Sequence, residues 1–250
     1  MSLRHAFLPG LASVLLAPAC VIHVPCCDSG LVVDGVTLDE KHEENLELGP
    51  WHPSGLTIES SLGDLAFEPT DGPSRVIATL HEAELGDAYL VHEEGKLGVR
   101  SFSGEPVALG DAHVYVNGEL PALTVSTGMG DVHVHGIGIA GACSLETGMG
   151  TLSLADVHAG GEATLTSGMG DVEVEGVHSA RITAESGMGN VILRHVTTGD
   201  ADLSSGMGDI ELDGSAFNIL QAETGLGNVE CRESTYVQRH LESGLGSVDG

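Results

Sequence analysis

One four-residue pattern recurs through the second half of the chain: Thr or Ser, then Gly, then Met or Leu, then Gly. Its copies begin 19 or 20 residues apart, at Thr127, Thr147, Ser167, Ser186, Ser205, Thr224 and Ser243. A repeat of nearly constant length indicates one structural unit stacked on copies of itself. Weaker Gly-Asp copies at 63–64, 86–87 and 110–111 extend the series toward the N-terminus. The sequence therefore predicts a stack of about ten coils.

Each repeat contains two short strands. In residues 167–185, apolar and charged residues alternate from Asp171 to Glu175, which is typical of a strand with one buried face. Gly176 breaks this run, and a second alternating run covers residues 180–184. No segment of the repeats combines helical periodicity with capping residues. Each unit is thus expected to be strand, bend, strand and turn.

Aligning the repeats places apolar residues in columns. One column contains Val132, Leu152, Val172, Val191, Ile210, Val229 and Val248. A second contains Val125, Leu145, Leu165, Ala184, Leu203, Ala222 and Leu241. Such columns are typical of the inner wall of a parallel β-solenoid, where the strands of successive coils pair at about 4.8 Å. The predicted fold class is therefore all-β, a parallel β-solenoid with coils of 19–20 residues.

The chain is expected to divide into four segments. Residues 1–19 combine a basic start, an apolar run and a small-residue cleavage pattern, which is typical of a secretory signal peptide. Residues 20–46 are expected to be a tether. Residues 47–126 are expected to form less regular β coils that cap the stack, and residues 127–250 the regular solenoid.

The residue after the signal peptide leaves two processing routes open. Cys20 follows Ala17-Pro18-Ala19 directly, as in a bacterial lipoprotein, where the cysteine becomes the lipid anchor. The same tripeptide also suits ordinary cleavage, which would release a free protein. Either route predicts an exported protein of the cell envelope, as an outer-membrane lipoprotein or in the periplasm or on the surface.

The charge of the chain excludes several partners. It carries 37 Asp and Glu against 9 Lys and Arg, a net charge of −28. Nucleic acid is disfavoured because phosphate contacts need cations. Anionic lipid is disfavoured for the same reason, so membrane contact is expected only through a lipid anchor. An envelope or surface partner is expected, and its identity stays open.

The cysteines do not predict a disulfide framework. Cys143 and Cys231 fall in inward columns about five coils apart, which is too far for a disulfide. They are expected to be small core residues. The pairing of Cys26 and Cys27 stays open.

The sequence contains none of the common catalytic motifs. The chain has no nucleophile elbow, zinc-protease helix motif or phosphate-binding loop. Uniform coils also leave no room for the inserted loops from which solenoid enzymes build a cleft. The chain is therefore expected not to be an enzyme, with no catalytic residues and no cofactor.

Divalent-cation binding is the alternative function. A Gly-rich corner with Asp is similar to the repeats that bind Ca²⁺ between coils, but Asp and Asn also bond the backbone of turns. The second explanation is favoured, so the corner residues are expected to be structural. These residues are Gly130, Asp131, Gly170, Asp171, Gly189, Asn190, Gly208 and Asp209.

Histidine columns offer a second kind of metal site. His113 and His133 are expected in adjacent coils with His135 beside them, and His158 and His178 in another column. Stacked imidazoles about 5 Å apart could ligate Zn²⁺ or Cu²⁺ if a carboxylate completed the shell. The methionine column of the corners is instead expected to pack as apolar side chains, because Leu continues it at Leu226 and Leu245.

These residues also carry a family resemblance. The segments "SGMGDVEVEG", "SGMGDIELDG" and "LTIESSLGDLAFEP" resemble a bacterial domain family of unknown function described as putative adhesin, over roughly residues 47–250. The resemblance implies a β-helical stack on an exported protein and supplies no catalytic residues. The favoured function is thus a non-enzymatic, adhesin-like interaction or spacer module.

The last coil is predicted to be a self-association surface. Residues 243–250 begin a further repeat but do not supply its second strand. Apolar Val237 and Leu241 would then lie near an open sheet edge, and such edges pair with other chains.

Overall fold

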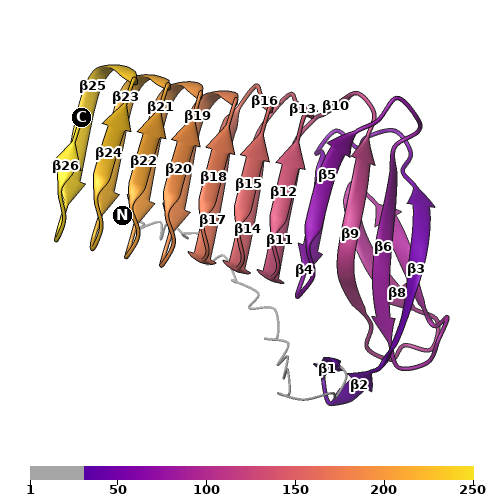
Figure 1. The fold of residues 1–250 in the computed structure, drawn as a ribbon. Coiled ribbons are helices and arrows are strands. Elements are labelled where there is room, and N and C mark those ends of the chain that lie inside the picture. Colours follow the sequence, from indigo (N-terminus) through magenta and orange to yellow (C-terminus); the bar gives the residue numbers. More distant parts are fainter. Residues whose placement is uncertain (1–30) are drawn as a thin grey trace, which may run out of the picture.

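The structure, a computed structural model, describes residues 31–250, and this range consists of β-strands joined by turns (Figure 1). Along the regular part, two large sheets of parallel strands form a flattened solenoid of about seven turns. The predicted all-β parallel solenoid is confirmed. None of the residues from 31 to 250 belongs to a helix with the length and apolarity needed to cross a bilayer.

The eleven-stranded sheet supplies one wall of the solenoid. In spatial order its strands are β26 (Val248–Asp249), β24 (Val229–Arg232), β22 (Ile210–Asp213), β20 (Val191–Arg194), β18 (Val172–Glu175), β15 (Leu152–Ala155), β12 (Val132–His135), β5 (Leu65–Pro69), β9 (Ala108–Val116), β6 (Arg75–Glu82) and β3 (Glu40–Glu47).

The thirteen-stranded sheet supplies the opposite wall. Its longer strands are β25 (Thr235–Ser243), β23 (Ala216–Thr224), β21 (Thr197–Ser205), β19 (His178–Ser186), β17 (Glu162–Met169), β14 (Cys143–Met149), β11 (Leu123–Met129), β4 (Leu56–Ser60), β8 (Lys96–Ser101) and β7 (Ala88–Glu93). Three short strands continue it at the top of Figure 1, β16 (His158–Ala159), β13 (Gly138–Ile139) and β10 (Glu119–Leu120). A separate hairpin joins β1 (Leu31–Val33) to β2 (Val36–Leu38).

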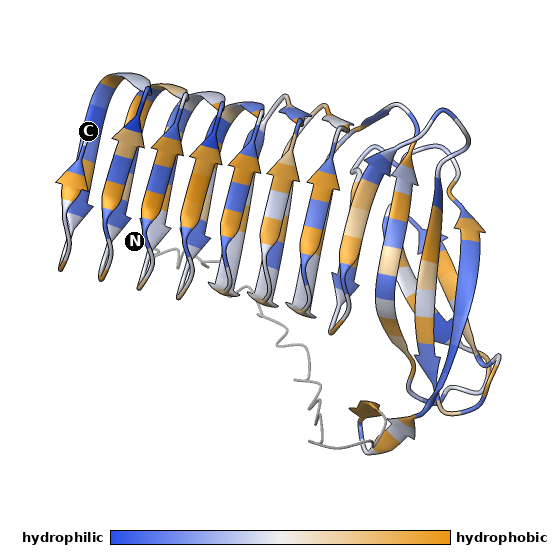
Figure 2. Cartoon of the chain, viewed as in Figure 1, coloured by the Kyte–Doolittle hydropathy of each residue, from blue (hydrophilic) through white to orange (hydrophobic). Residues whose placement is uncertain are grey.

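The core lies between the two sheets and is built from the predicted columns. Val172 pairs in register with Leu152 and Val191, and all three are buried. Apolar and polar residues alternate along these strands, which gives them the banded colouring of Figure 2. Because the two faces alternate residue by residue, a shift of register by one would expose the whole apolar set.

The change in repeat length from 20 to 19 residues has a structural counterpart. His158 pairs with His178, whereas Ala163 pairs with Ile182. The extra residue therefore lies around Gly160-Gly161, where the earlier coils break into a short and a long strand. From β19 onward one continuous strand replaces the two.

The bend after each of the solenoid strands from β12 to β24 contains a residue with a left-handed backbone. The φ angle is +62° at Gly176, +53° at Asp156 and +53° at His195. Glycine and larger residues alternate at this position from coil to coil, because a Cβ on Gly176 would lie 2.6 Å from Asp156 Oδ1. The side chain of one coil thus fills the space beside the glycine of the next.

The N-terminal region departs from the predicted order of coils. After β5 the chain forms β6, β7 and β8, and β9 then returns along the outer side of β5. As a result β12 pairs with β5 and not with β9. Gly110-Asp111 is therefore not next to Gly130-Asp131, and Gly86-Asp87 lies in the loop between β6 and β7. This is why the stack has about seven parallel turns instead of about ten.

The predicted tether, residues 20–46, is corrected over the part that the structure describes, because residues 31–38 form the β1–β2 hairpin. Residues 40–47 form β3, which pairs antiparallel with β6. Alternate side chains of β3 are partly buried and make specific bonds. His42 Nδ1 lies 2.6 Å from Glu82 Oε1, and the Leu90 N–H donates to Glu44 Oε2 at 2.6 Å.

Candidate functional site

The repeated motif forms the corner where the chain passes from the thirteen-stranded to the eleven-stranded sheet. Its Ser or Thr is buried in six corners and half-buried at Ser243. From Thr147 onward the hydroxyl donates to the carbonyl of the second motif Gly in the preceding coil, at 2.7–2.9 Å. In two corners the hydroxyl also accepts a backbone N–H, from Gly189 to Ser186 and from Gly208 to Ser205. The hydroxyl therefore joins each coil to the one before it.

The Asp or Asn after the second Gly joins each coil to the one after it. Asp171 Oδ1 accepts the Asn190 N–H at 2.7 Å, and Asn190 Oδ1 accepts the Asp209 N–H at 2.9 Å. The same bond runs from the Thr151 N–H to Asp131 and from the Asn228 N–H to Asp209. One side-chain oxygen of each of these residues is thus already used by the stack, which favours a structural role over Ca²⁺ binding.

The motif glycines are required by the close approach of successive corners. A Cβ on Gly170 would lie 2.1 Å from the Gly150 carbonyl oxygen, and one on Gly208 would lie 2.2 Å from that of Gly189. Backbone meets backbone here, so no side-chain movement could make room. Ser or Thr, Gly and Asp or Asn are therefore explained by the bonds and contacts between coils.

The methionine column is the part of the motif that stacking does not explain. The sequence predicted apolar packing, but Met149, Met169, Met188 and Met207 are between 42% and 52% exposed. Leu226 and Leu245 continue the column at 49% and 75% exposure. The prediction of corner packing is wrong, because the neighbouring glycines carry no side chains to cover these residues.

The five histidines proposed as metal ligands form one of the two expected columns and not the other. His113 and His133 both pair with Ala66, from opposite sides, so one strand separates them. His113 Nε2 instead lies 3.1 Å from Glu68 Oε2, and its ring stacks on Tyr115 with the ring centroids 4.5 Å apart.

The remaining histidines are exposed. His135 Nδ1 lies 3.9 Å from Asp156 Oδ2. His158 and His178 are adjacent, as predicted, with ring centroids 6.4 Å apart. The structure thus brings together one of the two predicted histidine pairs.

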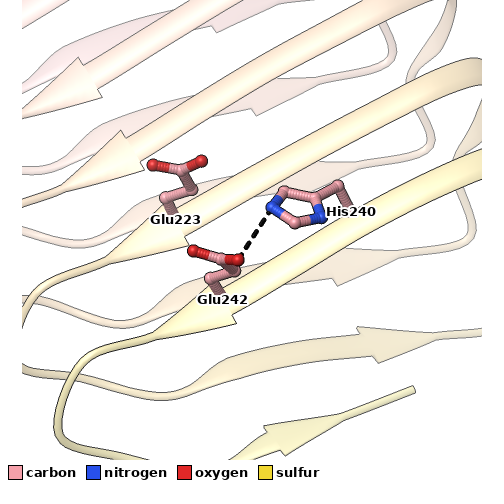
Figure 3. Close-up of side chains that lie close together, drawn as sticks. All are labelled: Glu223, His240 and Glu242. Carbon is pink, nitrogen blue, oxygen red and sulfur yellow. Dashed lines mark ion pairs between the residues drawn. The ribbon is translucent and has the colours of Figure 1, made fainter.

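A different group has the donor set of a cation site. Glu223, His240 and Glu242 each offer a ligand atom, and these atoms lie within 4.8 Å of one another; no other such group of three occurs in residues 31–250. Figure 3 shows His240 and Glu242 on one strand, with Glu223 on the next. His240 Nε2 lies 3.0 Å from Glu242 Oε1. The 19-residue spacing of the glutamates could have revealed this group in the sequence.

Ionisable groups with shifted pKa values serve the fold. Burial raises the pKa of the Cys143 thiol to about 12, so this cysteine is an inert core residue. Burial by itself would raise the pKa of Glu82, but hydrogen bonds from the N–H groups of Ala88 and Gly86 and from the His42 side chain outweigh burial. The pKa of Glu82 is therefore lowered. Glu82 thereby holds the β6–β7 loop. Cys231 is a free, half-buried thiol with a pKa that burial raises.

The last coil carries a charge where the core column ends. The column Ala163, Ile182, Ala201 and Leu220 continues into Arg239. The guanidinium of Arg239 lies 4.8 Å from the centroid of the Tyr236 ring. An inward-pointing charge discourages strand addition at a sheet edge. Self-association through this coil stays a prediction, and Arg239 argues against it.

Cys20, the predicted lipid anchor, lies outside the described residues.

Comparison with known proteins identifies the family. A putative adhesin from Bacteroides fragilis shares the fold with a TM-score of 0.56 and 13% identity, over 84% of this chain and 97% of that one. A putative adhesin from Parabacteroides distasonis does so with a TM-score of 0.55 and 14% identity, over 86% and 99%. No curated protein matches the chain. The model of the Toastrack DUF4097 family matches residues 53–249, and the chain therefore belongs to this family.

Proposed function

We propose that this protein is a non-enzymatic, adhesin-like interaction module of the cell envelope. The observation that carries the proposal is the use of the corner residues. Hydroxyls, carboxylates and glycines that could form a reactive site are instead engaged between coils, and this leaves a long, regular outer surface. Proteins of the same fold that are described as putative adhesins support the proposal.

The dispersal of reactive groups supports a non-enzymatic role. Catalytic groups need shifted pKa values and mutual hydrogen bonds in a cleft. The pKa values of Glu82 and Asp87 are lowered, and both carboxylates accept backbone N–H groups. Glu82 binds Gly86 and Ala88 at the β6–β7 loop, and Asp87 binds Ser103 in the segment after β8. The buried thiol of Cys143 is held in its protonated form. These groups stabilise loops or fill the core.

We also propose that Cys20 anchors the protein to the membrane as a lipoprotein. The motif before Cys20 carries this step, and Val21 follows it with no Asp that would favour retention at the inner membrane. Cys20→Ser is expected to move the protein from the membrane fraction to the soluble fraction. A wild-type protein that is soluble and begins with an unmodified Cys20 would show ordinary cleavage instead.

The adhesin role is tested in cells of the native host. Attachment to protein-coated surfaces and to neighbouring cells is compared for the wild type, a deletion strain and the deletion strain carrying the wild-type gene. We expect deletion to reduce attachment and the restored gene to recover it. Equal attachment in all three strains would contradict the adhesin role. The protein would then be a spacer, and removing it would change only the distance between the membrane and a reporter attached beyond it.

Divalent-cation binding is the second candidate function, favoured by the group of Glu223, His240 and Glu242. A ligand that binds only the native state raises its melting temperature by mass action. Melting is measured with EDTA and with added Zn²⁺ or Ca²⁺, for the wild type and for His240→Gln. A rise with Zn²⁺ that His240→Gln abolishes would support a site at this group. Equal melting curves with and without the metals would exclude it.

A further inference from the structure

The exposed side chains of the corner column form a continuous apolar ridge. We define the ridge as the six residues Met149, Met169, Met188, Met207, Leu226 and Leu245. Register pairing places the residues of successive corners side by side, as for Met149 and Met169. In Figure 1 the ridge follows the lower edge of the solenoid, where each coil turns from one sheet to the other. At about 4.8 Å per coil the ridge is roughly 24 Å long.

The fold does not require apolar residues in the ridge. The hydrogen bonds of each corner come from the Ser or Thr, the second Gly and the Asp or Asn, and none involves the ridge side chain. A polar residue at the ridge position would be better solvated, yet every regular coil carries Met or Leu there. Contiguous exposed apolar side chains mark interaction sites, whereas isolated ones do not.

Carboxylates border the ridge on both sides. The column three positions before the ridge contains Glu146, Glu185, Glu223 and Glu242. The column two positions after the ridge contains Asp171 and Asp209. Asp131 continues this column in the coil that precedes Met149, the first ridge residue. No Lys or Arg occupies either column. Within residues 31–250, none of these seven carboxylates forms an ion pair with Lys or Arg.

We infer that the ridge binds a cationic amphipathic helix of a partner protein. Such a helix presents an apolar stripe bordered by Lys and Arg, which matches an apolar ridge bordered by carboxylates. A length of roughly 24 Å corresponds to about 16 helical residues. Flexible methionines suit such a contact because they adapt to differently shaped apolar partners. The inference deepens the proposed function, on which it rests, by naming the partner chemistry of the interaction module.

The test uses the full chain and a helical Lys/Leu peptide of about 16 residues as the probe. Two variants carry four substitutions at the same positions, Met149, Met169, Met188 and Met207, to Gln in one and to Leu in the other. We expect the Gln variant to bind the peptide at least about tenfold more weakly than the wild type. The Leu variant is expected to bind within about threefold of the wild type, because it keeps the apolar surface.

A second pair of variants separates local charge from total charge. Glu146→Gln, Glu185→Gln and Glu223→Gln together are expected to weaken binding about tenfold at low salt. Glu84→Gln, Glu94→Gln and Glu105→Gln remove the same charge from exposed loops of the N-terminal region and are expected to have little effect. Melting curves establish that each variant is folded.

Oxidation gives an independent readout at the same positions. Mild peroxide converts exposed methionine to the polar sulfoxide. Oxidised wild-type protein is expected to lose binding, whereas the four-Leu variant treated in the same way keeps it.

Three outcomes would overturn the inference: the Gln and Leu variants bind alike, both sets of Glu substitutions weaken binding equally, or the wild type does not bind the peptide. If peptide binding fails while deletion still reduces attachment of cells, the proposed function stands and only the ridge assignment is lost. If peptide binding behaves as expected but deletion leaves attachment unchanged, the ridge assignment stands without the adhesin role.

Discussion

The regular solenoid and the N-terminal region stabilise their strands in different ways. In the solenoid one set of bonds is repeated in coil after coil, as between Ser205 and the Gly189 carbonyl. In the N-terminal region the contacts occur once. Glu82 is buried and binds His42 and two loop N–H groups, and the Tyr89 and Phe102 rings stack with their centroids 4.3 Å apart.

The difference follows from the position of the two regions in the stack. Each solenoid coil bonds to a preceding and a following copy, so one motif satisfies its backbone and corner groups on both sides. The first coil has no preceding copy and would present an open edge. Strands β9, β6 and β3 cover that edge, and their unique neighbours require unique side chains. A repeat therefore specifies the middle of a stack but not its end.

The largest effect is expected from a charge in the solenoid core. Val172→Asp should unfold the solenoid, because an unpaired carboxylate would enter the apolar space between the sheets. We expect the free energy of unfolding to fall by about 4 kcal/mol or more. Glu173→Lys, on the exposed face of the same strand, should change stability by no more than about 0.5 kcal/mol. Urea titration measures both, and equal losses would contradict the inside and outside assignments.

A smaller but substantial loss is expected at a corner glycine. Gly170→Ala should destabilise the stack by about 2 kcal/mol or more, because its Cβ would lie 2.1 Å from a backbone oxygen of the preceding coil. Gly49→Ala is the control, since nothing lies within 4 Å of a Cβ there. Thermal unfolding of the two variants compares them. A Gly170→Ala protein as stable as the wild type would show that the corners are not in close contact.

The N-terminal region should respond to pH through Glu82. Because the folded-state pKa of Glu82 lies below its ordinary value of 4.5, its stabilisation is complete above that pH and is lost as pH falls through the folded-state value. Glu82→Gln should cost about 1–3 kcal/mol at neutral pH. The stability of the Glu82→Gln variant should then vary less with pH below 4.5 than the stability of the wild type. Parallel pH profiles for the two proteins would contradict this role.

The smallest of these effects is expected for one corner hydroxyl. Ser205→Ala removes the bonds to the Gly189 carbonyl and the Gly208 N–H, and should cost about 1–2 kcal/mol. Ser204→Ala, at the neighbouring outward position, should be close to neutral. Thermal unfolding compares the two variants. If Ser205→Ala is as stable as the wild type, the bond from the Ser205 hydroxyl to the Gly189 carbonyl does not help to join the coils.

Most of the regular solenoid could be predicted from the sequence. The 19–20 residue period and the strict alternation identify the parallel strands, and the columns of Val172 and Leu165 lie in the core as expected. Such inferences succeed because each coil repeats the environment of its neighbour. Part of the candidate site was missed for a local reason. The methionine stands between two glycines, where alternation no longer tells an exposed side chain from a packed one.

Other features were decided only by the tertiary structure. The repeat predicted which residues share a column, but not which coil lies beside which. Asp131 was expected next to Asp111, whereas its backbone N–H bonds to Asp64, and Asp64 bonds to Asp111 in turn. The same insertion of β5 separates His113 from His133. Period and alternation depend on local spacing, and neither encodes the order of strands. That order depends on pairing between segments far apart in the chain.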